Sequence, residues 1–247
     1  RQDKGNETVK DKRFYRTFFA MYIVLVFQNV ISLSVNLADN IMLGAYSETS
    51  LSGVAAVNQI QFIYQQLLMA AGDGMVIFCS QYWGKKQIGP VKKIAATAMH
   101  TGLAFALILF LAVSLFPHQA VGLFTTDEAI IAEGVKYLAV IRFTYLFFAV
   151  TTILLATLRS VEIVKIAFYL SVSTLVINCC INYVLIYGRF GAPQLGVIGA
   201  AIGTLAARII ECAVAVWYVL KKEPNLKMRI SDYFHTDRIL RKDYYKT

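Results

Sequence analysis

The chain has 247 residues, of which 57% are hydrophobic and 16% are charged, and its formal net charge is +9. Typical soluble domains are about 45–50% apolar and about 25% charged, so this composition excludes an ordinary soluble fold. It also excludes an intrinsically disordered chain, because disordered chains lack the apolar residues that a core requires. The composition is typical of a membrane protein.

Six stretches are long and apolar enough to cross a bilayer, which takes roughly 20 residues at about 1.5 Å rise per residue. Short breaks that carry Gly, Pro, Ser or like charges separate them, as turns between helices do. The alternation that marks the strands of a membrane barrel is missing from the sequence. We therefore predict an all-α fold, a polytopic bundle of six transmembrane helices. The predicted ranges are 14–43, 51–83, 91–116, 133–157, 164–188 and 195–220.

The basic residues sort to one side of the predicted bundle. Twenty of the 24 Lys and Arg fall near the N-terminus, in the second and fourth breaks, or after Leu220. Such an excess marks the cytoplasmic side. We therefore expect a multi-pass protein of the cell membrane with both ends cytoplasmic and the lipid bilayer as its surroundings. The +9 is then an orientation signal, and nucleic acid is not an expected partner.

Three regions follow from these spans. Residues 1–13 are expected to be a cytoplasmic N-terminal segment and residues 14–220 the six-helix transmembrane lobe. The tail 221–247 mixes apolar residues at helical spacing with Lys and Arg. It is expected to be a cytoplasmic linker, either an amphipathic helix on the membrane surface or a segment that is helical only when packed.

Polar residues recur at helical spacing in four of the spans. Polar side chains inside a membrane usually face a cavity or a partner, so this recurrence is informative. One polar residue per span would be explained by a hydrogen bond between helices, whereas four stripes favour a pathway for a solute or an ion. Asp73 lies between two glycines and is either solvated at a loosened helix or functional. The residues expected to line the cavity are Gln28, Ser32, Asn36, Asn58, Gln61, Gln65 and Asp73.

Asp39 stands out among these polar residues because no basic residue lies near it in the sequence. A carboxylate buried without a partner either takes a proton or binds a cation, as an ion-coupled transporter requires. The alternative is an interfacial Asp that caps a helix end. Arg208 and Glu211 are three residues apart on one helix face, which predicts a structural ion pair.

Three stretches resemble a known family in combination: NLADNIMLGAYSETSLSGVAAVNQ, FCSQYWGKKQ and INCCINYVLIYGRFGAPQLGVIGAAIGTLAAR. Together they look like the N-terminal half of a multidrug and toxic compound extrusion (MATE) transporter. The resemblance implies one six-helix lobe of a twelve-helix protein that exports cationic or amphipathic drugs or metabolites in exchange for Na⁺ or H⁺. It also implies a C-terminal six-helix half as partner, small-molecule substrates and no cofactor or metal site beyond the coupling ion.

The same resemblance implies a cation or proton site. The family's first-helix aspartate falls on Asp39, its fifth-helix asparagine on Asn178 and its sixth-helix threonine on Thr204. A fourth-helix tyrosine falls on Tyr137 as a weaker match. Some members carry a second aspartate where this chain has Asn182, so a site of two carboxylates is not expected here. Oxygens of Asn178, Asn182 and Thr204 are expected to assist Asp39.

Two alternatives remain open from the sequence. A lipid or oligosaccharide flippase of the same superfamily would need a strongly cationic cavity, whereas Arg142 and Arg208 are the basic residues that the spans offer. An intramembrane aspartyl-type enzyme could use Asp39 and Asp73, but the sequence around Asp73 lacks the Gly-x-Gly-Asp context of such proteases. No HExxH or phosphate-binding loop is present, so we do not expect an enzyme.

Overall fold

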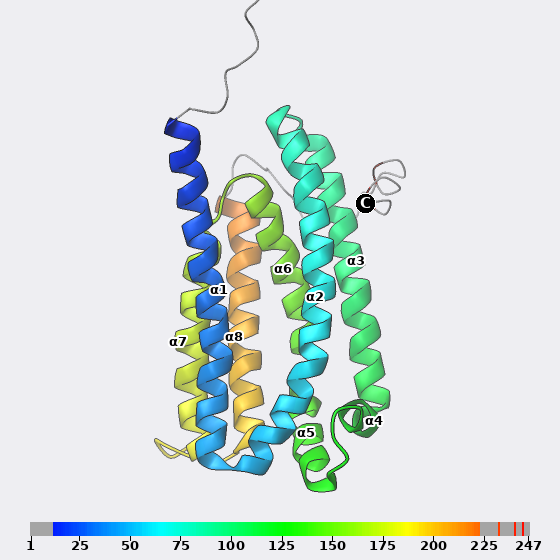
Figure 1. Ribbon diagram of the computed structural model, residues 1–247, viewed down its shortest axis with the longest axis vertical. Coiled ribbons are helices and arrows are strands. Elements are labelled where there is room, and N and C mark those ends of the chain that lie inside the picture. Colours follow the sequence, from blue (N-terminus) through cyan, green and yellow to red (C-terminus); the bar gives the residue numbers. More distant parts are fainter. Residues whose placement is uncertain (1–11, 223–231, 233–239, 241–243, 245–247) are drawn as a thin grey trace, which may run out of the picture.

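The computed structural model describes residues 12–222 together with Asp232, Leu240 and Tyr244. Most of the predicted segments 1–13 and 221–247 therefore lie outside the described residues. All regular structure in the described part is helical (Figure 1). The elements are α1 Lys12–Tyr46, α2 Glu48–Gly84, α3 Ile88–Leu115, α4 Pro117–Gly122, α5 Glu128–Ile141, α6 Thr144–Ser160, α7 Lys165–Tyr187, α8 Val197–Trp217 and the short π-helix η1 Tyr218–Lys222.

Five of the six predicted spans are single helices, and α1, α2, α3, α7 and α8 are each long and apolar enough to cross a membrane. The fourth prediction is corrected. The stretch 133–157 is not one straight helix, because α5 and α6 meet at an angle of 56° and form one span only as a bent pair. The third break also holds the short helix α4, which was not predicted from the sequence. Pro117 occupies its first turn, where a missing N–H is tolerated.

The bend arises where a side chain takes over a backbone acceptor. The Thr144 hydroxyl donates to the Ile141 carbonyl across 2.6 Å. In a regular helix that carbonyl would accept from the N–H of Tyr145, which donates instead to Arg142 at 3.3 Å. A side chain that enters the hydrogen-bond ladder in this way is a common cause of a kink.

Arg142 lies at the bend and packs among aromatic rings. Its guanidinium carbon lies 5.2 Å from the centre of the Phe143 ring and 5.9 Å from that of Phe110 on α3. Cation–π contacts of this kind hold a charged side chain against an apolar surface. Arg142 therefore serves the packing of α3 against the bent span and lines neither of the cavities described below.

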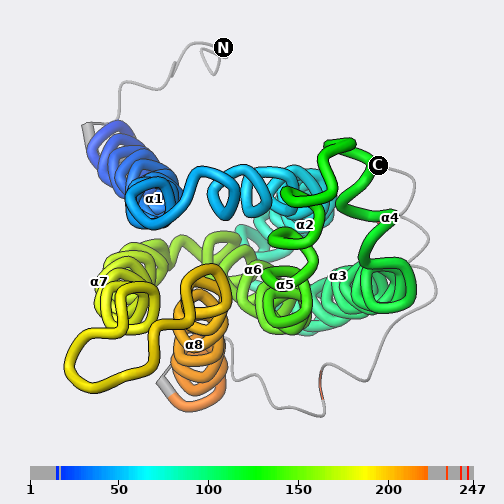
Figure 2. Tube along the Cα trace, turned by 90° about the horizontal axis from the view of Figure 1, so that it is seen from below, coloured from blue at the N-terminus to red at the C-terminus, as the bar shows by residue number. Residues whose placement is uncertain are grey.

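The helices form two groups that share a boundary along α8. Helix α7 packs on α1 and α8, while α2 packs on α3, α5 and α6, and α8 also packs against α5 and α6. The view from below shows α1 and α2 along one side of the bundle, with α7 and α8 beside them and α3 at the far end (Figure 2). A cavity bounded by α1, α2, α6, α7 and α8 can therefore form between the groups.

Two glycines of α8 allow α7 to approach closely. A Cβ atom at Gly199 would lie 2.7 Å from the backbone carbon of Leu185, and one at Gly203 would collide with the side-chain oxygen of Asn182. The small residues of the predicted Gly-x-x-x-Gly motif thus permit the contact for which such motifs are used in membranes. The contact brings Asn182 of α7 directly against α8.

Consecutive spans run in opposite directions, so the segments between them that carry Lys and Arg lie at one end of the bundle. The start of α1, the α2–α3 turn, the α6–α7 turn and η1 lie together at the top of Figure 1. Lys85 and Lys86 lie in the first of these turns, Arg159 and Lys165 flank the second, and Lys222 ends η1. The cytoplasmic orientation of this end stays a prediction.

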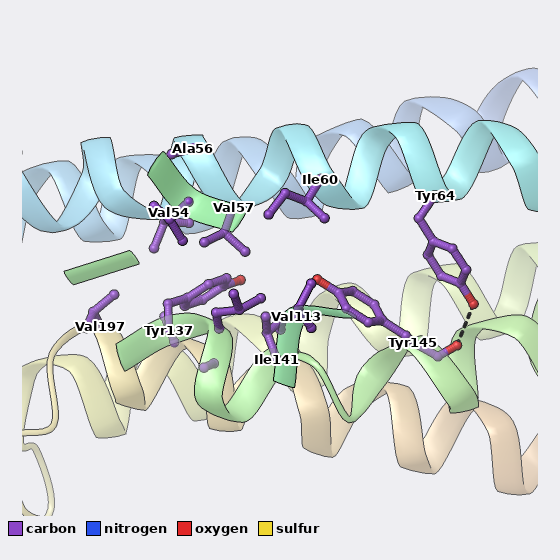
Figure 3. Packing of buried hydrophobic residues seen from close by; sticks show 14 of the residues in the cluster. Val54, Ala56, Val57, Ile60, Tyr64, Val113, Tyr137, Ile141, Tyr145 and Val197 are labelled. Atoms are coloured by element: carbon purple, nitrogen blue, oxygen red, sulfur yellow. Dashed lines mark hydrogen bonds between the residues drawn. The ribbon is translucent and has the colours of Figure 1, made fainter. Parts of the chain in front are cut away.

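The core of the lobe lies between α2 and the bent span. Val57, Ile60 and Tyr64 of α2 face Tyr137, Ile141 and Tyr145, as Figure 3 shows. The Tyr64 hydroxyl donates to the Tyr145 carbonyl across 2.7 Å, and the two rings lie 5.3 Å apart. The bond satisfies the buried Tyr64 hydroxyl and joins α2 to the start of α6.

Candidate functional site

Asp39 lies in the third-last turn of α1 with 8% of its surface exposed. Its Oδ1 accepts a hydrogen bond of 2.6 Å from the Asn182 Nδ2 of α7. The same Nδ2 donates to Asn178 Oδ1 at 3.2 Å, and Asn178 Nδ2 donates to Thr204 Oγ1 of α8 at 3.0 Å. A continuous network therefore joins α1, α7 and α8 at Asp39.

The geometry of this network follows from local helix structure. Asn178 and Asn182 are four residues apart on α7, so their side chains stack on one face. Thr204 meets that face because Gly203 beside it leaves room for Asn182. Buried amides and hydroxyls require hydrogen-bond partners, and here the three bonds satisfy every member of the network except Asn182 Oδ1.

A small cavity of about 20 Å³ adjoins this network. A cavity of roughly 10–15 Å³ is enough to hold one water molecule, so this one suits a single small particle. Four of the five residues predicted for the cation site line it: Asp39, Tyr137, Asn178 and Thr204. Tyr137 of α5 is buried, and its presence here brings the weaker family match into the same site.

The fifth predicted residue, Asn182, has a role that differs from the expectation. Asn182 does not line the small cavity, and it turns its amide nitrogen rather than its oxygen toward Asp39. Its Oδ1 is buried against Gly203 and has no hydrogen-bond partner among the described residues. The structure therefore makes Asn182 a donor to the carboxylate, because an acceptor beside a charged Asp39 would be repelled.

A second cavity of about 590 Å³ opens next to the first. Ligand sites in proteins commonly measure about 300–1,000 Å³, so this volume suits a small organic molecule. The two cavities share Asn36, Asn58, Gln61 and Arg208 in their walls. All seven residues predicted to line a cavity do line this one: Gln28, Ser32, Asn36, Asn58, Gln61, Gln65 and Asp73.

Arg208 and Glu211 form the ion pair that their spacing predicts. Arg208 Nη1 lies 2.7 Å from Glu211 Oε2, and the guanidinium carbon lies 4.8 Å from the centre of the Phe148 ring of α6. Both partners line the large cavity, and Arg208 also lines the small one. The pair is therefore part of the cavity wall as well as of the packing of α8.

A second ion pair at the edge of the large cavity was missed by sequence reasoning. Arg159 Nη2 of α6 lies 2.5 Å from Asp73 Oδ1 of α2, and the side chains are 34% and 58% exposed. Asp73 is thus paired with an opposite charge at a half-exposed position. No local sequence pattern could reveal this pair, because the two residues are 86 positions apart. The available signal was Arg159 itself, a basic residue just after the fourth predicted span.

Together the two cavities offer two kinds of binding. The small one presents a carboxylate, an amide oxygen and a hydroxyl, which are the oxygen ligands that hard cations prefer. A proton on Asp39 would serve the same charge balance. The large one presents amides, hydroxyls, the Phe148 ring and the two ion pairs Asp73–Arg159 and Glu211–Arg208, a lining that suits a polar organic compound.

The comparison with protein families decides the assignment, because the family model MatE matches residues 25–184. The chain belongs to the MatE family. The matched range includes Asp39, Asn178 and Asn182 and ends before Thr204. The family expected from the sequence motifs is thereby confirmed.

Curated relatives of this MatE chain carry the names of transporters and resistance proteins. It is 26% identical over 197 residues to the probable multidrug resistance protein NorM of Thermotoga maritima, which covers 79% of this chain and 42% of the relative. It is 28% identical over 218 residues to the protein of the same name from Streptococcus pneumoniae, which covers 85% and 46%. The uncharacterized transporter YisQ of Bacillus subtilis is 28% identical over 202 residues, with 80% and 43% covered. The chain spans less than half the length of these relatives.

Solved structures share the fold of this MatE chain. A crystal structure described as MATE in the bent conformation superposes with a TM-score of 0.83 at 17% identity and covers 94% of this chain and 51% of that one. An outward-facing multidrug resistance MATE family transporter of the MOP superfamily gives 0.83 at 16%, with 94% and 50% covered. The chain is thus an all-helical, multi-pass membrane protein whose fold equals about half of those transporters, as predicted.

Proposed function

We propose that the chain is the N-terminal lobe of an ion-coupled antiporter that exports cationic or amphipathic drugs or metabolites in exchange for Na⁺ or H⁺. The observation that carries this proposal is the buried Asp39 beside a water-sized cavity that shares its wall with a cavity of about 590 Å³. An ion and an organic solute can then occupy neighbouring sites. Because the chain spans less than half of its curated relatives, a second six-helix half is proposed to complete the pathway.

Asp39 is the proposed site of the coupling ion. Na⁺ would contact the carboxylate together with Asn178 Oδ1 and Thr204 Oγ1, which line the same small cavity, whereas H⁺ would bind Asp39 itself. Either event removes the negative charge that the Asn182 amide now accommodates.

Neutralisation is proposed to change the packing of three helices. Asp39 lies on α1, Asn178 and Asn182 on α7, and Thr204 on α8, so the loss of one charge alters contacts among all three. Removal of the cost of a buried charge favours closer packing. The large cavity would then lose affinity for its solute while the two lobes rock and switch access.

The cavity charges favour this proposal over a flippase for lipids or oligosaccharides with phosphate groups. The two arginines that line the large cavity, Arg159 and Arg208, are each paired with a carboxylate. A phosphate group would require unpaired positive charge, which the described cavity walls do not offer.

The test is transport by the full-length protein in vesicles, with Na⁺ and pH gradients imposed separately and efflux of a cationic dye recorded. Asp39→Asn should insert normally and lose gradient-driven efflux. Asp127→Asn is the matched control, since Asp127 caps α5 outside both cavities and Asn caps helices equally well. Normal efflux by Asp39→Asn would overturn the proposal.

A further inference from the structure

Arg208 occupies the boundary between the two cavities. It is one of the four residues that line both, and it is the charged one among them. Its guanidinium bonds to Glu211 and lies above the Phe148 ring. Arg208 therefore borders the cavity that Asp39 lines as well as the cavity that Glu211 lines.

The charges of the cavity walls are balanced when one monovalent cation is added. The described residues that line the cavities include five charged ones, namely Asp39, Asp73, Arg159, Arg208 and Glu211. Asp73 is balanced by Arg159, and Glu211 by Arg208. Asp39 alone is left with a neutral donor, Asn182. One monovalent cation makes the site neutral, and a second makes it positive, which is costly where water is scarce.

Phe148 and Glu211 already contact an organic cation in this structure, namely the guanidinium group of Arg208. Glu211 is 5% exposed and faces the large cavity, and the Phe148 ring lies beside it. A buried carboxylate next to an aromatic face is a recurrent arrangement for the recognition of lipophilic cations. A substrate cation would therefore find the same two contacts that Arg208 now makes.

We propose that Arg208 and Glu211 are an exchangeable pair, in which a lipophilic monocation takes Glu211 while the released Arg208 turns to Asp39 and replaces the coupling ion there. Arg208 is then the positioning residue that makes the two cations exclude each other, and Glu211 is a residue of the substrate site. This inference rests on the proposed antiport and assigns the residues that produce its exchange.

A permanent structural pair is the competing interpretation, and the chain supplies a matched example. Glu133 and Lys136 on α5 have the same three-residue spacing, with Lys136 Nζ 2.6 Å from Glu133 Oε1. Neither residue lines a described cavity. Removal of charge there tests the general effect of breaking such a pair.

The experiment measures binding of tetraphenylphosphonium, a permanent lipophilic cation, to the full-length protein in detergent while Na⁺ and H⁺ are raised separately. In the wild type, the ion that couples to transport should weaken tetraphenylphosphonium binding, within the range of about 5–150-fold that is typical of linked sites. In Arg208→Gln both cations can be held, so this ion dependence should disappear. Lys136→Gln should keep it.

The double variant Arg208→Gln/Glu211→Gln guards against a single variant that fails to fold, because it leaves no unpaired charge. It should weaken tetraphenylphosphonium binding by at least about tenfold, or about 1.4 kcal/mol, while binding of the coupling ion persists. Unchanged ion dependence in Arg208→Gln, or unchanged tetraphenylphosphonium affinity in the double variant, would overturn the exchangeable pair alone. A wild type that responds to neither ion would overturn the proposed antiport and this inference with it.

Discussion

Asn182 of α7 donates its side-chain amide to Asp39 of α1 across 2.6 Å, although 143 positions separate them in the chain. A carboxylate gains most from donors when it is charged, so this amide stabilises Asp39 without adding a second charge. An aspartate at position 182, which the family resemblance leads one to expect in some members, could donate only while protonated. The network that joins α1, α7 and α8 therefore contains one carboxylate.

Asn182→Asp should make stability depend on a bound cation. The two carboxylates would face each other at hydrogen-bond distance and could not both remain charged. The folded variant would bind a proton that the unfolded chain does not, so its stability should rise as pH falls. At neutral pH without Na⁺ it should lose at least about 1.5 kcal/mol, the lower end of what a hydrogen bond to a charged group contributes. Thermal unfolding in detergent across pH measures both effects.

Asn182→Leu is the control, because leucine has nearly the same shape and brings no acid. It should destabilise the protein by removing the donor to Asp39 while its stability changes less steeply with pH. If Asn182→Asp shows the same pH profile as Asn182→Leu, the two side chains at positions 39 and 182 are not in direct contact.

Helical periodicity explains why the lining of the large cavity was predictable. Gln28, Ser32 and Asn36 recur at four-residue spacing on α1, and this spacing alone places them on one face. Polar faces on several spans must meet one another because lipid cannot accept them. The fold class and the positions of five spans followed from segment length and hydropathy in the same way.

Features that depend on contacts between distant residues were not predictable. The bend after α5 has no Gly or Pro to announce it and depends on the hydroxyl of Thr144. The pairing of Asp73 with Arg159 requires α2 and α6 to lie side by side. The direction of the Asn182 amide is set by what lies on either side of it, namely Asp39 of α1 and Gly203 of α8, so it depends on the packing of two other helices against α7.

Gly203→Ala should disrupt the Asp39 network through α8. Its Cβ would meet the side chain of Asn182, which has α1 on its other side and cannot easily withdraw. Overpacking of this kind costs about 1–3 kcal/mol, partly offset by the higher helix propensity of alanine. We expect a lower unfolding temperature in detergent together with loss of gradient-driven dye efflux.

Gly89→Ala provides the comparison, since a Cβ at Gly89 in α3 meets nothing within 4 Å. That variant should be neutral or slightly more stable, because alanine favours a helix by up to about 1 kcal/mol relative to glycine. Equal behaviour of the two variants would mean that α7 and α8 do not approach as closely at Gly203 as the structure shows.

Thr144→Val should straighten the bent span, because valine keeps the shape of threonine and removes the hydroxyl that occupies the Ile141 carbonyl. The N–H of Tyr145 can then return to Ile141 and continue the helix. With arms of 14 and 17 residues and a bend of 56°, straightening lengthens the span by about 5 Å at 1.5 Å rise per residue. Spin labels at Glu128 and Glu162, in a background without the four native cysteines, report this distance by double electron–electron resonance.

Thr157→Val is the control for Thr144→Val, since the Thr157 hydroxyl bonds to Ile153 within the regular part of α6 and its removal should leave the distance unchanged. An unchanged distance in Thr144→Val would show that packing around the bend, rather than the Thr144 hydroxyl, holds the two arms at their angle.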